Sequence, residues 1–249
     1  MIERIDTKRG RIALYCLGDL SLWRARTLLS KEPETIEWID GFADGEVFWD
    51  VGANVGLYSV YAAINRKVRV LSFEPSASNY MLLNRNIEIN TLSNNVRAFC
   101  IAFADRTCID ALNMQSTQLA GALSSFAEAI DHEGRGFKPV FQQGMVGYSI
   151  DDYVTSFSPP FPNHLKIDVD GIEDKIVAGA RATLADPRMR SLSIELEANR
   201  NEHTAAIIRR IEDAGLKLVS RRHASEFDNG PYADVYNYQF RRQSSERRM

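Results

Sequence analysis

The sequence predicts an α/β fold built around a mostly parallel β-sheet. From residue 46 onward, short apolar segments typical of buried strands alternate with segments of helical periodicity. That alternation indicates consecutive βαβ units. Glycines directly follow the first of these strands, as in turns that bring backbone N–H groups close to a ligand. The 249 residues, 45% of them hydrophobic and 25% charged, are enough for one such domain.

The individual elements follow from apolar periodicity and from cap residues. Residues 1–40 are expected to form a helical extension, with helices at 21–29 and from Pro33 onward, and residues 41–241 the main domain. The strands are predicted at 46–51, 68–73, 96–102, 164–169, 192–196, 216–220 and 235–240, the last of them antiparallel. The helices are predicted at 57–65, 76–90, 172–184 and 202–214, with a short helix opened by the capping-box pattern Ser149-x-x-Asp152.

One long segment, 107–148, breaks this regularity. It is rich in Gly, Ser, Gln and Ala and shows no firm periodicity, apart from a short helix that we expect near 119–130. Long irregular segments in compact domains are usually functional loops or lids. We expect this one to act as a lid that sets acceptor specificity, and the alternative is a disordered surface insertion. Residues 242–249 are predicted to be a solvated basic tail.

Charge and cysteine content exclude several classes of protein. The net charge of −3 and the pI of about 5.9 argue against a protein that mainly binds nucleic acid. No apolar run is long enough for a membrane span. The three cysteines form no metal-binding pattern, and their odd number together with the charged N-terminus predicts a cytoplasmic protein.

The first chemically informative segment is Asp-Val-Gly-Ala-Asn-Val-Gly at residues 50–56. Gly52 and Gly56 let the backbone approach a ligand closely, and Asn54 tolerates a left-handed conformation. The spacing is not GxGxxG, which weakens a dinucleotide site. The carboxylate of Asp50 would repel a phosphate and suits a ligand that carries an ammonium group. A plain strand-to-helix turn remains the alternative.

The second informative residue is Glu74, which follows the next predicted strand. It lies 24 positions after Asp50, about where an acidic residue meets ribose hydroxyls in such folds. The alternative is an ordinary surface glutamate at a strand end. The two segments together are more specific than either is alone.

These segments resemble the FkbM family of S-adenosylmethionine-dependent methyltransferases, within the Rossmann-like class I superfamily. The resemblance rests on DVGANVGLYS at 50–59, FEPSASNYMLLNRNIEIN at 73–90 and LKIDVDGIEDKIVAGA at 165–180. It implies a seven-stranded sheet whose last strand is antiparallel, with helices on both faces, S-adenosylmethionine at the ends of the first two strands, and methyl transfer to a hydroxyl oxygen. Asp170 departs from the family pattern, which usually has Glu there.

Carried over residue by residue, the resemblance implies a donor site made of two strand-end segments. Asp50, Gly52, Asn54 and Gly56 would surround the methionyl part of the donor, and Glu74 would bind its ribose. Three residues after the third strand would lie near the adenine: Ala102, Phe103 and Asp105.

The distal motif supplies the candidate catalytic residues Lys166 and Asp168. The two are spaced to share one face of a strand, and Asp168 lies where open α/β sheets bind ligands. Lys166 has a structural alternative as half of a buried ion pair. Asp170 and Glu173 have capping-box spacing, which favours a structural role for both.

The next strand adds the third catalytic candidate, Glu195. Asp168 with Glu195 or Asn199 resembles an oxygen-rich Mg²⁺ site, although the loose spacing does not favour a metal. His132, in the irregular segment, is a further candidate base.

Taken together, the sequence predicts a methyltransferase that acts on a hydroxyl of a small-molecule, sugar or polyketide-like acceptor. Nitrogen methylation is the alternative within the same class. A nicotinamide-dependent oxidoreductase and a donor-binding protein without turnover are the alternatives from other classes, and the missing GxGxxG motif disfavours the former.

Overall fold

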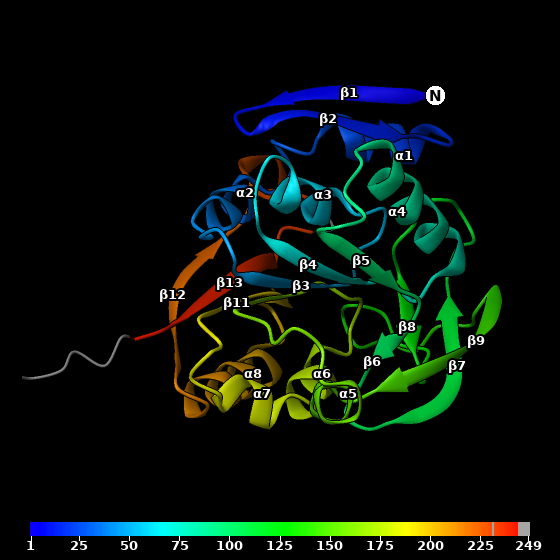
Figure 1. The fold of residues 1–249 in the computed structure, drawn as a ribbon. Helices are drawn as coiled ribbons and strands as arrows, with labels where there is room; N and C mark the ends of the chain where they lie inside the picture. The colour runs from blue at the N-terminus through cyan, green and yellow to red at the C-terminus, as the bar shows by residue number, and fades with distance from the viewer. Residues whose placement is uncertain (231, 244–249) are drawn as a thin grey trace, which may run out of the picture.

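A central seven-stranded β-sheet lies between two layers of helices (Figure 1). The computed structural model describes residues 1–230 and 232–243. One face of the sheet carries α2 (Pro33–Asp40), α3 (Leu57–Ala63) and α4 (Ala77–Ile89). The opposite face carries α5 (Ile150–Phe157), α6 (Glu173–Ala178), α7 (Arg181–Ala185) and α8 (Asn201–Asp213).

The order of strands in the sheet is β12-β13-β11-β10-β3-β4-β5. These strands are β3 (Val47–Val51), β4 (Arg69–Phe73), β5 (Val96–Phe99), β10 (His164–Ile167), β11 (Ser191–Glu197), β12 (Leu216–Arg222) and β13 (Val235–Arg242). Only β13 runs antiparallel to its neighbours β11 and β12. The predicted seven-stranded, mostly parallel sheet with an antiparallel last strand is therefore confirmed.

The central strand β3 explains why helices cover both faces. All five of its residues are buried. Trp49 packs in the core on the side of α5 to α8, and Phe48 packs in the core on the side of α2 to α4. Because successive side chains of a strand point to opposite faces, an apolar strand such as this one needs cover on both.

The helix after β10 differs from the prediction. The apolar stripe Ile172, Ile176, Ala180 and Leu184 is buried as expected, but it belongs to two short helices, α6 and α7. Asp170 is not the N-cap of α6. The N-cap is Ile172, and the carboxylate of Asp170 instead accepts hydrogen bonds from the backbone N–H groups of Leu123 and Ser124, at 2.6 and 3.1 Å. The predicted cap at Ser149 does form, since its hydroxyl accepts from Asp152 N at 3.0 Å.

The N-terminal segment contains a β-hairpin that was not predicted. Strands β1 (Ile2–Thr7) and β2 (Gly10–Tyr15) pair antiparallel and precede α1 (Asp19–Arg26), so the segment is not purely helical. Backbone N–H groups of Ala13 and Tyr15 donate to the side chains of Asn90 and Asn86, which ties the hairpin to α4 and its C-terminal end. No residue of β1 is fully buried, and only Ile12 and Leu14 of β2 are, so the apolar alternation of the hairpin is short and easily missed.

The irregular segment 107–148 is folded as a second, smaller sheet. It supplies β7 (Cys108–Met114), β8 (Ser124–Phe126) and β9 (Phe141–Tyr148), which join β6 (Ala102–Phe103) in the order β6-β9-β7-β8. The short helix expected near 119–130 does not form, because part of that range is β8. Leu112, Phe126 and Met145 are buried in the main core, so this sheet is attached to the domain by apolar packing.

The C-terminal part of the chain completes the sheet edge. A short 3-10 helix, η1 (Ser225–Phe227), connects β12 to β13. Of the predicted basic tail 242–249, Arg242 ends β13 and residues 244–249 lie outside the described residues. Within the part that is described, no helix combines the length and the hydropathy needed to cross a membrane.

A pair of glycines tests how strongly the turn after β3 constrains the fold. Gly45 and Gly52 both have a left-handed φ, of +87° and +81°. A Cβ added at Gly45 would meet no atom within 4 Å, whereas one at Gly52 would overlap the carbonyl oxygen of Asp168. Gly45→Ala should therefore cost about 1–2 kcal/mol of unfolding free energy from backbone strain alone, and Gly52→Ala clearly more. Denaturant titrations of both variants check this, and an equal loss of unfolding free energy in the two variants would contradict it.

Candidate functional site

A cavity of about 530 Å³ lies at the carboxyl ends of β3, β4 and β10. Its floor contains Gly52, Glu74 and Asp168, the residues that follow these three strands. The N-terminal segment, the 107–148 segment and the loop before β13 supply its walls, through residues such as Trp23, Gln118 and Tyr232. Ligands of open α/β sheets bind at this end of the strands, so the cavity is the candidate functional site.

The turn after β3 forms the innermost wall of the cavity. The N–H groups of Gly52 and Ala53 donate to Phe73 O at 2.9 and 3.1 Å, which bends the chain back over the end of β4. Asn54 has a φ of +50°, and Gly56 precedes α3 with a φ of +82°. Gly52 and Asn54 line the cavity, and their contact with a donor stays a prediction. Gly56 is not part of the lining, and it lies against Leu83.

Glu74 lines the cavity next to this turn. Its carboxylate accepts hydrogen bonds from the N–H groups of Asn54, at 2.7 Å, and Ser76, at 2.9 Å. Only 5% of the residue is exposed. Burial raises the pKa of Glu74 to about 7, although both N–H donors favour the charged form. Glu74 is therefore a buried carboxyl whose charge changes near neutral pH, and not a surface residue.

Asp50 lies behind the cavity lining. It is 1% exposed, and its Oδ2 accepts a hydrogen bond from Ser59 Oγ at 2.6 Å. Its Oδ1 is buried without a hydrogen-bond partner among the described residues. Burial raises the pKa of Asp50, and the positive charge of Lys166 on the neighbouring strand opposes that rise.

Three carboxylates meet at the side of the cavity away from Glu74. Oxygen atoms of Glu32, Asp168 and Glu195 lie within 4.8 Å of one another. Two lysines accompany them. The ammonium group of Lys166 contacts Asp168, and Lys31 Nζ lies 2.9 Å from Glu32 Oε1. The structure thus brings together all three sequence-predicted catalytic candidates, Lys166, Asp168 and Glu195, and adds the pair Lys31 and Glu32 from the N-terminal segment.

The lysines and carboxylates of this group shift one another's pKa values. Lys166 is 1% exposed, and the carboxylates of Asp168 and Glu32 raise its pKa even though burial acts in the opposite direction. Lys31 and Lys166 together lower the pKa of Glu32 despite its burial. Burial and the charge of Asp168 raise the pKa of Glu195 well above its usual value. Glu195 is therefore the carboxyl of the group that most readily holds a proton.

The residues suggested for a metal are not all brought together. Asn199 is exposed and donates a hydrogen bond to Asp234 at 3.3 Å, while Asp168 and Glu195 face the cavity. The third oxygen-bearing side chain near Asp168 and Glu195 is Glu32 and not Asn199. The signal for Glu32 was weak, because an acidic residue before Pro33 is typical of any helix start.

The residues predicted near the adenine are separated from one another. Ala102 and Phe103 are buried in the core, at 4% and 3% exposure, and Asp105 is exposed beside Arg106. None of the three contributes to the cavity lining. Their contact with a donor stays a prediction.

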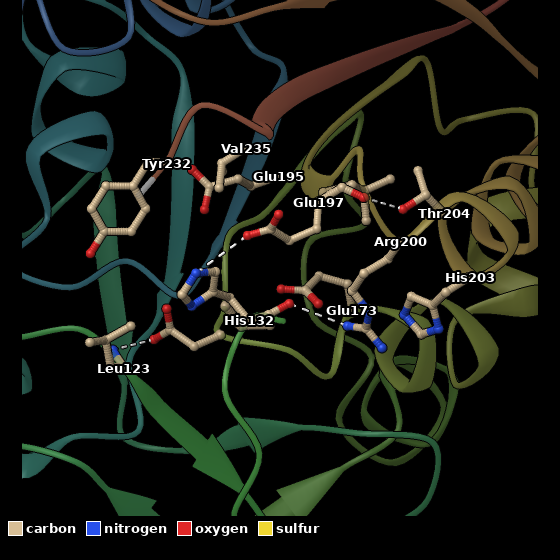
Figure 2. Close-up of a pocket in the computed structure, with 13 residues that line it drawn as sticks. Leu123, His132, Glu173, Glu195, Glu197, Arg200, His203, Thr204, Tyr232 and Val235 are labelled. Carbon is tan, nitrogen blue, oxygen red and sulfur yellow. Dashed lines mark hydrogen bonds and ion pairs between the residues drawn. The ribbon is translucent and has the colours of Figure 1, made fainter. Parts of the chain in front are cut away.

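A second, small cavity of about 40 Å³ adjoins the first and shares Asp170 and Glu195 with it. Figure 2 shows His132, from the 107–148 segment, pointing toward Glu197 of β11. Its Nε2 lies 3.4 Å from Glu197 Oε1, and Arg200 donates to its backbone oxygen at 3.3 Å. Burial raises the pKa of Glu197. These contacts fasten the 107–148 segment to the end of β11.

Comparison with solved structures identifies the fold. Precorrin-6y C5,15-methyltransferase from Geobacter metallireducens aligns over 92% of this chain and 94% of its own, with a TM-score of 0.50 and 12% identity. Fibrillarin from Aeropyrum pernix, solved with bound S-adenosyl-L-methionine, aligns over 84% of this chain and 74% of its own, with a TM-score of 0.49 and 12% identity. The first of these likenesses shows the class I methyltransferase fold.

Sequence comparison gives the family. No curated protein matches the chain. The model of the methyltransferase FkbM domain matches residues 50–218, which include the turn after β3, Glu74, Asp168 and Glu195. The match covers well over half of the chain and carries with it S-adenosylmethionine as the implied methyl donor. The chain therefore belongs to the FkbM family of methyltransferases.

Proposed function

We propose that the protein transfers a methyl group from S-adenosylmethionine to a hydroxyl oxygen of a small-molecule, sugar or polyketide-like acceptor. The observation that carries the proposal is the 530 Å³ cavity, which has Glu74 at one side and the carboxylates of Asp168 and Glu195 at the other. One side suits the ribose of a nucleoside, and the other can accept the proton that a hydroxyl loses.

The residues present fit the donor. The turn at Gly52 packs so closely against Asp168 O that no side chain fits there, and Gly52 and Asn54 both line the cavity. Glu74 would bind the two ribose hydroxyls, and Gly52 and Asn54 would lie along the thioether-linked part. Asp50, Gly56, Ala102, Phe103 and Asp105 do not line the cavity and would support the site indirectly.

When bound, the donor supplies an electrophilic methyl group on a sulfonium. The protein's own task is to align an acceptor hydroxyl with it, and alignment can recover roughly 7–11 kcal/mol of barrier. Asp168, held by Lys166, would orient the hydroxyl. Glu195, whose raised pKa makes its carboxylate the stronger base, would take the proton.

The lysines beside the clustered carboxylates disfavour a bound Mg²⁺. Two of the three clustered carboxylates each have a lysine as a direct partner. A divalent cation would have to approach these ammonium groups, which repel it. The acidic character of the cavity also disfavours a nucleic-acid acceptor, whose phosphates would meet Glu32, Glu34 and Glu195.

The 107–148 segment would set acceptor specificity. Ser116, Gln118 and the range 121–124 line the cavity from this segment. The hydrogen bonds from Leu123 and Ser124 to Asp170 hold it next to Asp168. A folded segment that lines the cavity in this way can exclude water and complete an acceptor site, which a disordered insertion cannot do.

Donor binding should depend on Glu74. Glu74→Gln is expected to weaken binding of S-adenosylhomocysteine about 10- to 100-fold, because a hydrogen bond to a charged group contributes about 1.5–3 kcal/mol. Calorimetry measures this. Glu88→Gln is the matched control, since it removes the same charge at an exposed position outside the cavity and should leave affinity unchanged. Equal affinity of wild type and Glu74→Gln would contradict the ribose role.

Donor affinity should also rise with pH. With a pKa of about 7, Glu74 is largely protonated at pH 6, and the ionised form is the one that accepts both ribose hydroxyls. Binding at pH 6 must release that proton, so the dissociation constant should be about tenfold higher at pH 6 than well above pH 7. Calorimetry between pH 6 and 8 tests this, and a flat profile in wild type would refute it. In Glu74→Gln the dependence should largely disappear.

Turnover should depend on Asp168 and not on metal. Donor carrying an isotopically labelled methyl group, incubated with panels of sugars, macrolactones and amines, should label hydroxyl-bearing compounds, as detected by mass spectrometry. Asp168→Asn should slow that reaction by about 10²-fold, because the acceptor hydroxyl would be misaligned, with far less effect on S-adenosylhomocysteine affinity. Chelator should have no effect. Label on nitrogen alone would overturn oxygen transfer, and loss of activity in EDTA restored by Mg²⁺ would establish a metal.

A further inference from the structure

We propose that Lys31 and Glu32 form the receptor for the amino-acid end of the donor, with Lys31 binding the α-carboxylate and Glu32 the α-ammonium group. The inference rests on the proposed function. Both residues lie in the N-terminal segment, outside the range 50–218 that matches the family, so the family match assigns them no role.

The position of the pair is the first argument. Lys31 and Glu32 line the same cavity as Glu74, but they lie on the side where Asp168 and Glu195 are. Glu74 follows β4, while Asp168 and Glu195 come from β10 and β11, and β3 lies between β4 and β10. A nucleoside held at Glu74 that extends across the turn at Gly52 therefore reaches Lys31 and Glu32 with its far end.

The chemistry of the pair is the second argument. An α-amino acid carries one cation and one anion a few ångströms apart, and the cavity offers one anion and one cation as direct neighbours. Lys31 Nζ makes a single contact among the described side chains, with Glu32 Oε1. An ammonium group has three donors, so Lys31 can bind a carboxylate and keep this contact. Glu32 is fixed by a further hydrogen bond from Thr35 Oγ1 at 3.1 Å.

The charge balance is the third argument. Glu34 also lines the cavity, is 2% exposed, and has a buried Oε2 without a hydrogen-bond partner among the described residues. With Glu32 and Asp168 it gives three carboxylates against the two lysines, and Glu195 adds a fourth negative charge when it is ionised. A buried excess of negative charge is costly unless a cation compensates it. An α-ammonium group supplies that cation at this side of the cavity, and Lys31 stays available for the anion beside it.

Calorimetry with three ligands tests the assignment without any acceptor. S-adenosylhomocysteine carries both charges, its decarboxylated analogue carries only the ammonium group, and 5′-methylthioadenosine carries neither. Lys31→Met should weaken the binding of S-adenosylhomocysteine at least tenfold and leave the affinities of the other two ligands unchanged. Glu32→Gln should weaken the binding of both amine-bearing ligands. The affinity for 5′-methylthioadenosine should stay unchanged, and this result would also show that the cavity is intact.

Matched controls come from exposed positions. Lys67→Met and Glu37→Gln remove the same charges away from the cavity and should alter no affinity. If Lys31→Met lowered the affinity for all three ligands equally, the pair would only maintain the fold, and the proposal would be overturned. Lys31→Gln is the second variant if the methionine variant does not fold. In wild type alone, equal affinity for S-adenosylhomocysteine and its decarboxylated analogue would refute the carboxylate contact. Failure of wild type to bind S-adenosylhomocysteine at all would instead refute the proposed function.

Discussion

The buried ammonium group of Lys166 is the interaction on which the site depends. It lies on β10 in register with Asp50 of β3, contacts Asp168 directly, and together with Lys31 holds Glu32 in its charged form. Carboxylates this deeply buried would otherwise become neutral, since an isolated buried charge is too costly. One lysine thus stabilises acidic groups from three separate segments, of which Asp168 after β10 and Glu32 before α2 line the cavity and Asp50 of β3 lies behind it.

This arrangement divides the cavity into two chemical halves. Around Glu74 the backbone supplies most of the partners, through the N–H groups of Asn54 and Ser76, so that side is defined by hydrogen bonding. Around Asp168 the partners are charged side chains, so that side is defined by electrostatics. A donor that is a neutral nucleoside at one end and a charged amino acid with a sulfonium at the other matches both halves. A nicotinamide dinucleotide, with its central pyrophosphate, would place negative charge beside these carboxylates.

The parts predicted from the sequence are those whose signals are local. The β3 strand, the Gly52 turn and the position of Glu74 each follow from neighbouring residues, because strand burial and turn conformation are set within a few positions. Lys31 and Glu32 were missed because Glu32 gains its importance from lying near Asp168 and Glu195, more than 130 residues away, and Lys31 from its contact with Glu32. Asp170 shows the reverse error. Its spacing to Glu173 predicted an N-cap, but α6 begins after Ile172, and the carboxylate of Asp170 binds the N–H groups of Leu123 and Ser124 instead.

The two segments with the weakest sequence signals meet over the cavity. Arg24 of α1 donates to Ala120 O at 2.7 Å, and the amide groups of Asn54 and Asn79 both donate to Gly121 O. The N-terminal segment and the 107–148 segment are therefore joined to each other and to the donor turn. Ala120 and Gly121, which bond Arg24 and Asn54, are neighbours in the chain, so a shift of either segment would also act on the turn at Asn54. In the function that we propose, an acceptor wall that moved freely would also loosen the turn that positions the donor, and these hydrogen bonds oppose such movement.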